Sequence, residues 1–225
     1  MESVSVVSNG SKIDESFLRT YGDCIDILAV SCDSFDRSTN IKIGRTDHGK
    51  DYNNVAKLFQ IAGWCRRYGI KFKLNSVICT LNVEEDMAET VARLAPFRWK
   101  VFQVLMMPGE NDSARTKRDV TQLQISDQKF EDFCARHRHL ECFVPESNRL
   151  MKSSYLILDE YMRFLDKERD SASPSILAVG VSDAISKISW DEKSFFDRGG
   201  FYDWGREAGK ASKACGKSVA AELDF

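Results

Sequence analysis

The sequence predicts an α/β protein built on a parallel sheet, and three features of the chain indicate this class. Segments with the pattern of strands take turns with segments that carry an apolar stripe at helical spacing. The run 25–30 is apolar throughout, which is typical of a strand that is covered on both faces. Hydrophobic residues make up 43% of the 225 residues and charged residues 29%, as in ordinary globular proteins.

Four strand–helix units follow one another along the first 139 residues. Glycines 22 and 69 and Pro96 follow the first three helices, and Ser126 is expected to cap the fourth. Strand 70–78 alternates apolar with polar residues, which is the period of a strand. The predicted pairs are strand 3–8 with helix 13–21, strand 25–30 with helix 52–68, strand 70–78 with helix 84–94, and strand 99–106 with helix 127–137.

The pattern changes after residue 139. The sequence there predicts strands at 140–144 and 154–164, a charged linker at 166–173, helices at 181–188 and 191–197, and a mobile stretch at 205–221. Four parallel strands leave an open edge, which exposes unpaired backbone groups. Two interpretations of the pattern remain open: a small doubly wound sheet, or the later part of a larger β/α barrel.

Charge and cysteine usage exclude several classes of protein. The 32 Lys and Arg against 34 Asp and Glu give 32 − 34 = −2, which does not support electrostatic binding of nucleic acid. Seven cysteines, none in CxxC spacing, are typical of reduced thiols in the cytosol and do not predict a zinc site. No apolar run is long enough to cross a membrane, and the first residues lack the pattern of a signal peptide, so we expect a cytoplasmic chain.

The carboxyl ends of parallel strands meet at one edge of the sheet, where sites of such folds lie. Asn9 follows strand 3–8 and Ser31 follows strand 25–30. Their polar groups either bind a ribose or carboxylate, or merely cap turns.

Cationic side chains recur in the same region. Lys73 and Asn75 share one face of strand 70–78, and this face either lines an interior that holds an anion or faces water. Lys100 raises the same question on the next strand, and Arg45 lies in a loop at 41–50 that either folds over the edge or carries surface charge. Three cations would suit a triphosphate or a carboxylate.

Two features near the C-terminus are weaker signals. Gly199 and Gly200 after Arg198 would let backbone N–H groups approach a phosphate. Tyr155 lies in a predicted strand, where a tyrosine is usually a packed core residue.

Several long segments of the chain, in order and at similar spacings, resemble the viperin family of antiviral radical-SAM proteins. They are SVSVVSNGS (3–11), YGDCIDILAVSCDSFD (21–36), FKLNSVI (72–78), RWKVFQVLM (98–106), FVPESN (143–148), MKSSYLILDEYMRFL (151–165) and DEKSFFDRGGFYDW (191–204).

The resemblance implies a fold and a division of the chain. The family has a partial (β/α)6 barrel, of which residues 1–139 would supply strands three to six, and the chain as a whole the C-terminal two-thirds. Residues 140–204 would form a C-terminal extension with a loop that covers the nucleotide. Residues 205–225 would form a flexible tail ending in Leu-Asp-Phe.

The resemblance also implies an activity. In the family, a [4Fe–4S] cluster binds S-adenosylmethionine and cleaves it to a 5′-deoxyadenosyl radical. The radical removes the 4′ hydrogen of CTP, and loss of the 3′ hydroxyl as water gives 3′-deoxy-3′,4′-didehydro-CTP, which terminates viral RNA chains. The cofactor supplies the difficult chemistry, and the protein orients it.

Residue roles follow from the resemblance as well. Tyr155 matches a tyrosine proposed to return a proton or hydrogen. The cofactor-binding residues implied are Asn9, Ser31 and Arg45, and the substrate-binding residues are Lys73, Asn75, Lys100, Arg198, Gly199 and Gly200. Leu223, Asp224 and Phe225 match a tail that recruits the cytosolic iron–sulfur assembly machinery, with Phe225 in place of the usual tryptophan.

The sequence departs from the family pattern at its start. The CxxxCxxC cluster motif and the Gly-Gly-Glu-Pro motif are missing from these 225 residues. A site-differentiated cluster needs three thiolates, so we expect no cluster on this chain and no metal ligands. The family's membrane-binding N-terminal helix, which places it on the endoplasmic reticulum and lipid droplets, is missing too. The chain is therefore expected to be an N-terminally truncated dehydratase or, alternatively, a non-catalytic short form that binds nucleotides or proteins in antiviral defence.

Overall fold

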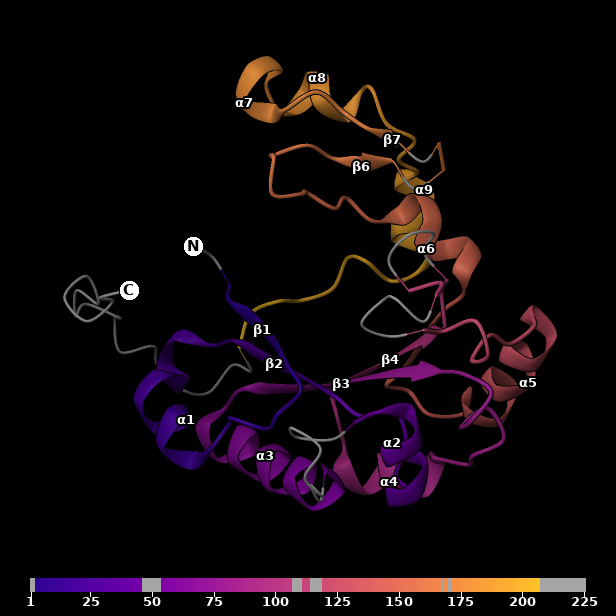
Figure 1. The fold of residues 1–225 in the computed structure, drawn as a ribbon. Helices are drawn as coiled ribbons and strands as arrows, with labels where there is room; N and C mark the ends of the chain where they lie inside the picture. Colours follow the sequence, from indigo (N-terminus) through magenta and orange to yellow (C-terminus); the bar gives the residue numbers. More distant parts are fainter. Residues whose placement is uncertain are drawn as a thin grey trace. The chain divides into compact units, whose positions relative to one another are not determined.

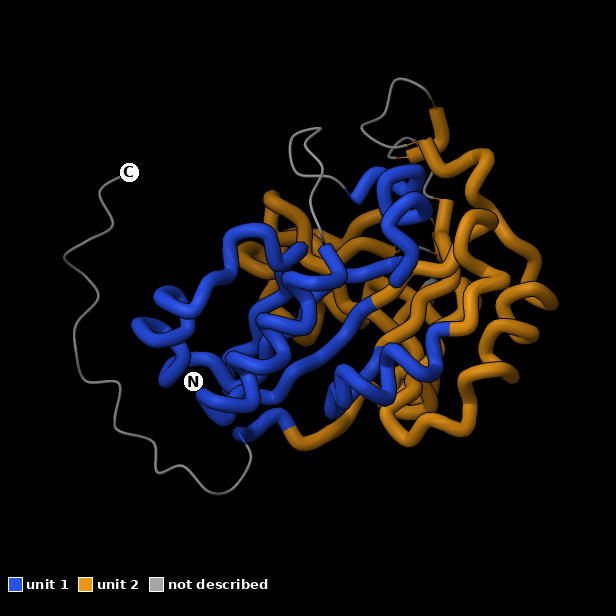
Figure 2. Tube along the Cα trace, turned by 90° about the horizontal axis from the view of Figure 1, so that it is seen from below, with its two compact units in different colours: residues 1–75, 87–99, 204–225 blue, residues 76–86, 100–203 orange. Residues whose placement is uncertain are grey.

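The structure is a computed structural model that describes residues 3–45, 54–106, 111–113, 119–166, 168–169 and 171–206. The chain divides into two compact units, drawn in blue and orange in Figure 2. Unit 1 comprises residues 1–75, 87–99 and 204–225, and unit 2 comprises residues 76–86 and 100–203. The domain boundaries drawn from the sequence at 139 and 204 stay a prediction.

Five strands form one sheet whose order follows the chain, β1-β2-β3-β4-β5. They are β1 (Ser5–Ser8), β2 (Ile27–Ser31), β3 (Lys71–Ile78), β4 (Arg98–Gln103) and β5 (Phe143–Glu146). The pairs β1–β2 and β2–β3 are parallel, which confirms the predicted class. A doubly wound sheet reverses its strand order at a switch point, whereas a β/α barrel adds strands in chain order. The observed order therefore favours the barrel interpretation.

Unit 1 packs helices against the first three strands. Its helices are α1 (Glu15–Tyr21), α2 (Arg37–Ile43), α3 (Asn54–Tyr68) and α4 (Ala88–Leu94), with a short 3-10 turn, η1 (Gly22–Cys24). Helices α1 and α3 contact each other and lie below strands β1–β3 in Figure 1. The core between these layers contains the fully buried side chains of Leu18, Leu28, Leu58, Ile61 and Leu74.

Unit 2 contains the end of β3, most of β4, all of β5 and a series of helices and short strands. These are α5 (Asp127–His137), α6 (Asn148–Ser154), β6 (Leu165–Asp166), β7 (Ser171–Ala172), α7 (Ile176–Val179), α8 (Val181–Ile185) and α9 (Glu192–Asp197). Helix α5 has the predicted bounds, and the Ser126 side chain accepts a hydrogen bond from the Lys129 N–H as its N-cap. Its buried face includes Phe130, Phe133 and Cys134.

Several local predictions were wrong, and local capping explains most of them. Helix α2 replaces part of the predicted loop at 41–50, because Asp36 caps its start and Gly44, at φ 90°, ends it. Gly22 is right-handed, so α1 continues into η1 instead of ending in a glycine cap. The predicted helix 84–94 begins only at Ala88.

The predicted strand 154–164 was also wrong. Ser147 caps helix α6, which runs to Ser154, and only an isolated bridge between Leu158 and Phe164 follows. The predicted linker 166–173 instead contributes to the antiparallel pair β6–β7. Most of the stretch predicted to be mobile, 205–221, lies outside the described residues. Across the part of the chain that is described, no helix has the length and apolar character needed to span a membrane.

Candidate functional site

A buried carboxylate lies at the centre of a polar cluster in unit 2. Glu146, the last residue of β5, is 0% exposed. Three side chains contact it: Lys100 from β4, Tyr155 directly after α6, and Arg198 directly after α9. These four residues, here called the Glu146 cluster, come from four segments between residues 98 and 198. Their convergence is a property of the fold and has no counterpart in any short stretch of sequence.

Lys100 is buried in this cluster, with 6% of its surface exposed. Its ammonium group forms an ion pair with Glu146 Oε1 and donates a hydrogen bond to the Tyr155 hydroxyl over 3.1 Å. A buried ammonium group is costly unless it is paired and hydrogen-bonded, and here both requirements are met. The sequence left open whether Lys100 faces water, and the structure excludes that interpretation.

Arg198 and Tyr155 complete the cluster. Arg198 NH1 lies 3.2 Å from Glu146 Oε1, and NH2 donates to the Ser154 carbonyl over 3.1 Å. Its guanidinium carbon lies 3.9 Å from the centre of the Tyr155 ring, a cation–π contact. The Tyr155 hydroxyl in turn donates to Glu146 Oε2. Tyr155 is thus held at its ring face by one cation and at its hydroxyl by another.

Gly199 and Gly200 follow Arg198, the C-cap residue of α9, and their backbone bonds to the helix hold the chain around Arg198 in place. Gly199 has φ 67°, and the two glycine N–H groups donate to the carbonyls of Phe196 and Phe195, each over 2.8 Å. A side chain at Gly200 would lie 2.5 Å from the Phe195 carbonyl oxygen. In this structure the two N–H groups bond the helix end, whereas the sequence suggested that they approach phosphate.

A second set of predicted residues lies at the carboxyl edge of the sheet in unit 1. Ser31 pairs in register with Asn75, and Ala29 pairs with Lys73. Because paired residues of parallel strands point to the same face, Ser31, Asn75 and Lys73 share one face of the sheet. Lys73 is only 8% exposed, so the water-facing interpretation was wrong for it. The side-chain oxygen of Asn75 is buried without a hydrogen-bond partner.

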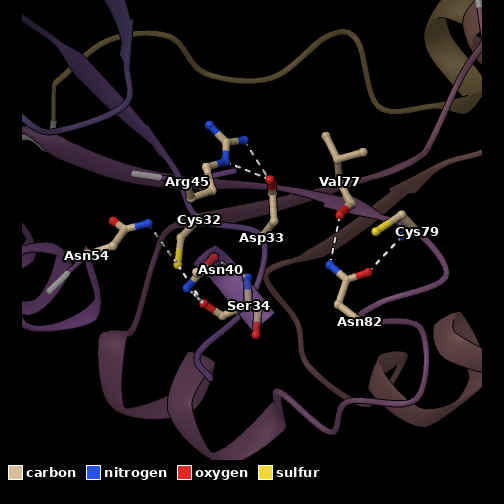
Figure 3. A network of polar contacts seen from close by, with 9 residues as sticks. All are labelled: Cys32, Asp33, Ser34, Asn40, Arg45, Asn54, Val77, Cys79 and Asn82. Carbon is tan, nitrogen blue, oxygen red and sulfur yellow. Dashed lines mark hydrogen bonds and ion pairs between the residues drawn. The ribbon is translucent and has the colours of Figure 1, made fainter. Parts of the chain in front are cut away.

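Arg45 forms a bidentate ion pair with Asp33, just after β2 (Figure 3). The Nε–Oδ2 and NH2–Oδ1 distances are 2.6 and 3.0 Å. Burial lowers the pKa of Arg45, but the hydrogen bond and charge of Asp33 outweigh this effect, so the pKa is raised overall. Arg45 is therefore not free surface charge. Its own N–H bonds the Asn40 carbonyl at the end of α2.

Further polar contacts hold the segment after β2 in place (Figure 3). Asn40 bonds both the N–H and the carbonyl of Ser34, and the Cys32 thiol donates to the Ser34 carbonyl over 3.2 Å. Asn54 Nδ2 lies 3.9 Å from Cys32 Sγ. This network fixes the loop that carries Asp33 and so fixes the position of Arg45.

Asn9 has a local role in the structure. It is exposed, and its side-chain oxygen accepts a hydrogen bond from the Ser11 N–H over 3.0 Å. This is the turn-capping geometry that the sequence offered as the alternative to ligand binding. Asn9 thus differs from Ser31 and Asn75, which the strand register places side by side.

Sequence reasoning missed the two buried acids, Asp33 and Glu146. Asp33 comes two residues after β2, and Glu146 is the last residue of β5. Both lie in segments that carry the family resemblance. The signal that could have found them was an acidic residue at or just after the end of a strand. Each acid neutralises cations that the sequence had singled out.

The cysteines and acids of the described ranges do not gather into a metal centre. Within those ranges, no group of three or more His, Cys, Asp or Glu side chains is arranged to hold a metal ion. Among the described cysteines, 32, 65, 79, 134 and 142 are free thiols.

Comparison with known proteins places the chain in a family. No protein-family model matches it. The chain is 52% identical over 208 residues to the S-adenosylmethionine-dependent nucleotide dehydratase RSAD2 of Oncorhynchus mykiss, covering 92% of this chain and 59% of the relative. It is 32% identical to the S-adenosylmethionine-dependent nucleotide dehydratase of Flammeovirga pacifica, covering 88% of this chain and 67% of the relative. The chain belongs to this family.

Membership confirms the resemblance seen in the sequence. The chain spans 57–59% of the length of the fish relatives that it matches. Among solved structures, Streptococcus suis SuiB aligns with a TM-score of 0.43 and 14% identity, covering 63% of this chain and 32% of that chain. A likeness at this level carries no argument about function.

Proposed function

We propose that this chain is part of a nucleotide dehydratase that uses S-adenosylmethionine and acts on CTP. Family membership supports the reaction class, since the relatives from Oncorhynchus mykiss and Flammeovirga pacifica are S-adenosylmethionine-dependent nucleotide dehydratases. The structural observation that carries the proposal is the Glu146 cluster, in which buried Lys100 contacts the Tyr155 hydroxyl and buried Arg198 lies against the Tyr155 ring.

The Glu146 cluster suits a polyphosphate ligand. The ammonium group of Lys100 acts as a compact point charge, and the guanidinium group of Arg198 offers a planar fork that matches phosphate oxygens. Arg198 and Lys100 are held by buried contacts, so little side-chain entropy would be lost when a ligand binds. The Tyr155 hydroxyl is hydrogen-bonded to the Glu146 carboxylate and to the Lys100 ammonium group, so Tyr155 is able to move a proton at that oxygen.

The sheet edge in unit 1 suits the polar part of S-adenosylmethionine or of the nucleotide. The unpartnered oxygen of Asn75 is an acceptor that a ligand hydroxyl or amine would satisfy, and Ser31 lies beside it. When bound to its cluster, the cofactor supplies the radical in this family. The described residues hold no set of cluster ligands, so the cluster is not assigned to them.

Binding of CTP to this chain tests the proposal. Isothermal titration calorimetry with CTP is expected to show binding, and Lys100→Ala is expected to weaken it by roughly 1–3 kcal/mol, the range for a charged hydrogen bond. Lys193→Ala is the matched control, because Lys193 is an exposed lysine of unit 2 paired only on the surface with Asp197. Absence of CTP binding, or equal loss in both variants, would contradict the nucleotide site.

Further proposals come from the family. UTP in the same titration reports whether the protein discriminates between the two bases, and weaker UTP binding supports CTP as the substrate.

The tail Leu223–Phe225, outside the described residues, is proposed to recruit the cytosolic iron–sulfur assembly machinery in antiviral defence, and the family's membrane contact is proposed to lie upstream. Deleting these three residues is expected to abolish co-purification with that machinery; unchanged recovery contradicts the tail's role.

A further inference from the structure

Glu146 is the most buried member of its cluster, yet the proposed function gives it no role. Its two oxygens are shared among Lys100, Arg198 and Tyr155. Of the four side chains in the cluster, two are cationic and one is anionic. Glu146 is thus the anion around which both cations are arranged in the protein without a ligand.

This arrangement places Glu146 in competition with any bound phosphate. A phosphate oxygen that approaches Lys100 or Arg198 meets a group already paired with a carboxylate. In a buried site, where the effective dielectric constant is far below that of water, repulsion between that carboxylate and a phosphate is strong. The same carboxylate also keeps both cations at defined positions before the ligand arrives, which lowers the ordering cost of binding.

We propose that Glu146 is a positioning residue of the polyphosphate site: it holds Lys100, Arg198 and the Tyr155 hydroxyl in place, and its negative charge limits how tightly the site binds a polyphosphate. This inference rests on the proposed nucleotide function and adds a residue that tunes it. It makes an unusual prediction, because removing the charge while keeping the side-chain volume is expected to weaken the fold and tighten binding at once.

Glu146→Gln separates these two effects. The glutamine has nearly the same volume and its side-chain oxygen accepts one hydrogen bond, but it no longer neutralises the two cations. Without ligand, the variant is expected to unfold at a lower temperature. With inorganic triphosphate as the probe, its dissociation constant is expected to fall on the order of tenfold, as expected for removal of one nearby like charge at an intermediate effective dielectric constant.

Two control variants distinguish charge from shape. Glu146→Asp keeps the charge, so its triphosphate affinity is expected to stay within about threefold of the original protein. Asp166→Asn removes a different buried carboxylate of unit 2, one that accepts hydrogen bonds from the N–H groups of Glu168, Arg169 and Ser189. This second variant is expected to lower stability without changing triphosphate affinity.

Calorimetric titration with inorganic triphosphate and with CTP tests the role of Glu146 and the nucleotide function separately. Tighter triphosphate binding by Glu146→Gln alone supports the inference, and equal or weaker binding overturns it. If the original protein binds neither ligand, the nucleotide function fails, yet a gain of triphosphate binding in Glu146→Gln still supports the role of Glu146. If Glu146→Gln is unfolded by itself, millimolar triphosphate is expected to restore its circular dichroism spectrum, and failure to do so overturns the inference.

Discussion

The two units neutralise their buried charges in different ways. In unit 1, Asp33 and Arg45 are 12 residues apart, and the pair is one acid against one base with the guanidinium group partly exposed. In unit 2, Glu146 serves two cations and a phenol drawn from segments up to 98 residues apart, all of them buried or half-buried. Among the contacts of the described residues, the local pair matches one acid with one base, whereas the long-range cluster has two cations for one carboxylate. The comparison teaches that the second region is the better place for an anionic ligand.

The largest expected difference between the units is in the free energy of unfolding when the buried acid of each unit is removed. Glu146→Ala is expected to lower the free energy of unfolding by about 3–5 kcal/mol, because it leaves two buried cations without their anion. Asp33→Ala is expected to cost less, about 1–3 kcal/mol, since Arg45 reaches water when its partner is lost. Urea unfolding of both variants measures the difference. Equal losses would show that the two regions are not distinguished by burial of their charges.

Two glycines offer the next test. Gly200→Ala places a methyl group against the Phe195 backbone, and we expect a loss of about 1–3 kcal/mol together with a shift of Arg198. Gly63→Ala, in the middle of α3 in unit 1, meets no atom within 4 Å and is expected to stabilise the protein by about 0.5–1 kcal/mol. Thermal unfolding of both variants checks the two signs, and a stable Gly200→Ala variant would contradict the close approach.

Lowering the pH is expected to destabilise the protein through His137 in unit 2. Burial lowers the pKa of His137 below 6.5, and its hydrogen bond to the Phe133 carbonyl and the nearby Asp86 only partly oppose this effect. The folded form therefore binds fewer protons than the unfolded form, so this contribution to stability is complete above about pH 6.5 and is lost as the pH falls through the folded pKa. His137→Gln is expected to flatten the pH dependence between about 7.5 and 5, measured by urea unfolding. His139→Gln is the control, and an identical slope in both would contradict the assignment.

Asn75 gives the smallest expected change in stability. Its side-chain oxygen is buried without a partner, so Asn75→Ala removes an unsatisfied group, and the free energy of unfolding is expected to change by less than about 1 kcal/mol. If the sheet edge of unit 1 binds a ligand, the same variant is expected to weaken CTP or S-adenosylmethionine binding in a titration. Unchanged binding of both ligands would leave the Glu146 cluster as the better-supported site.

The sequence by itself determined the elements whose signals are local. Helix α5 and strands β1 to β4 were predicted because their periodicity and caps are contained within a few neighbouring residues. The family was also predicted from the sequence, since long ordered segments carry that information directly. Helix α2 was missed because its signal rests on the caps Asp36 and Gly44 more than on an apolar stripe.

Only the tertiary structure decided which polar residues are buried and what neutralises them. The alternation of Lys73 with apolar residues is the same whether its face meets water or protein, because a strand's period does not depend on what covers it. The partnership of Lys100, Tyr155 and Arg198 with Glu146 depends on contacts between distant segments. Charge compensation in a low-dielectric interior is set by distances in space, and those distances are fixed by the order and packing of the strands.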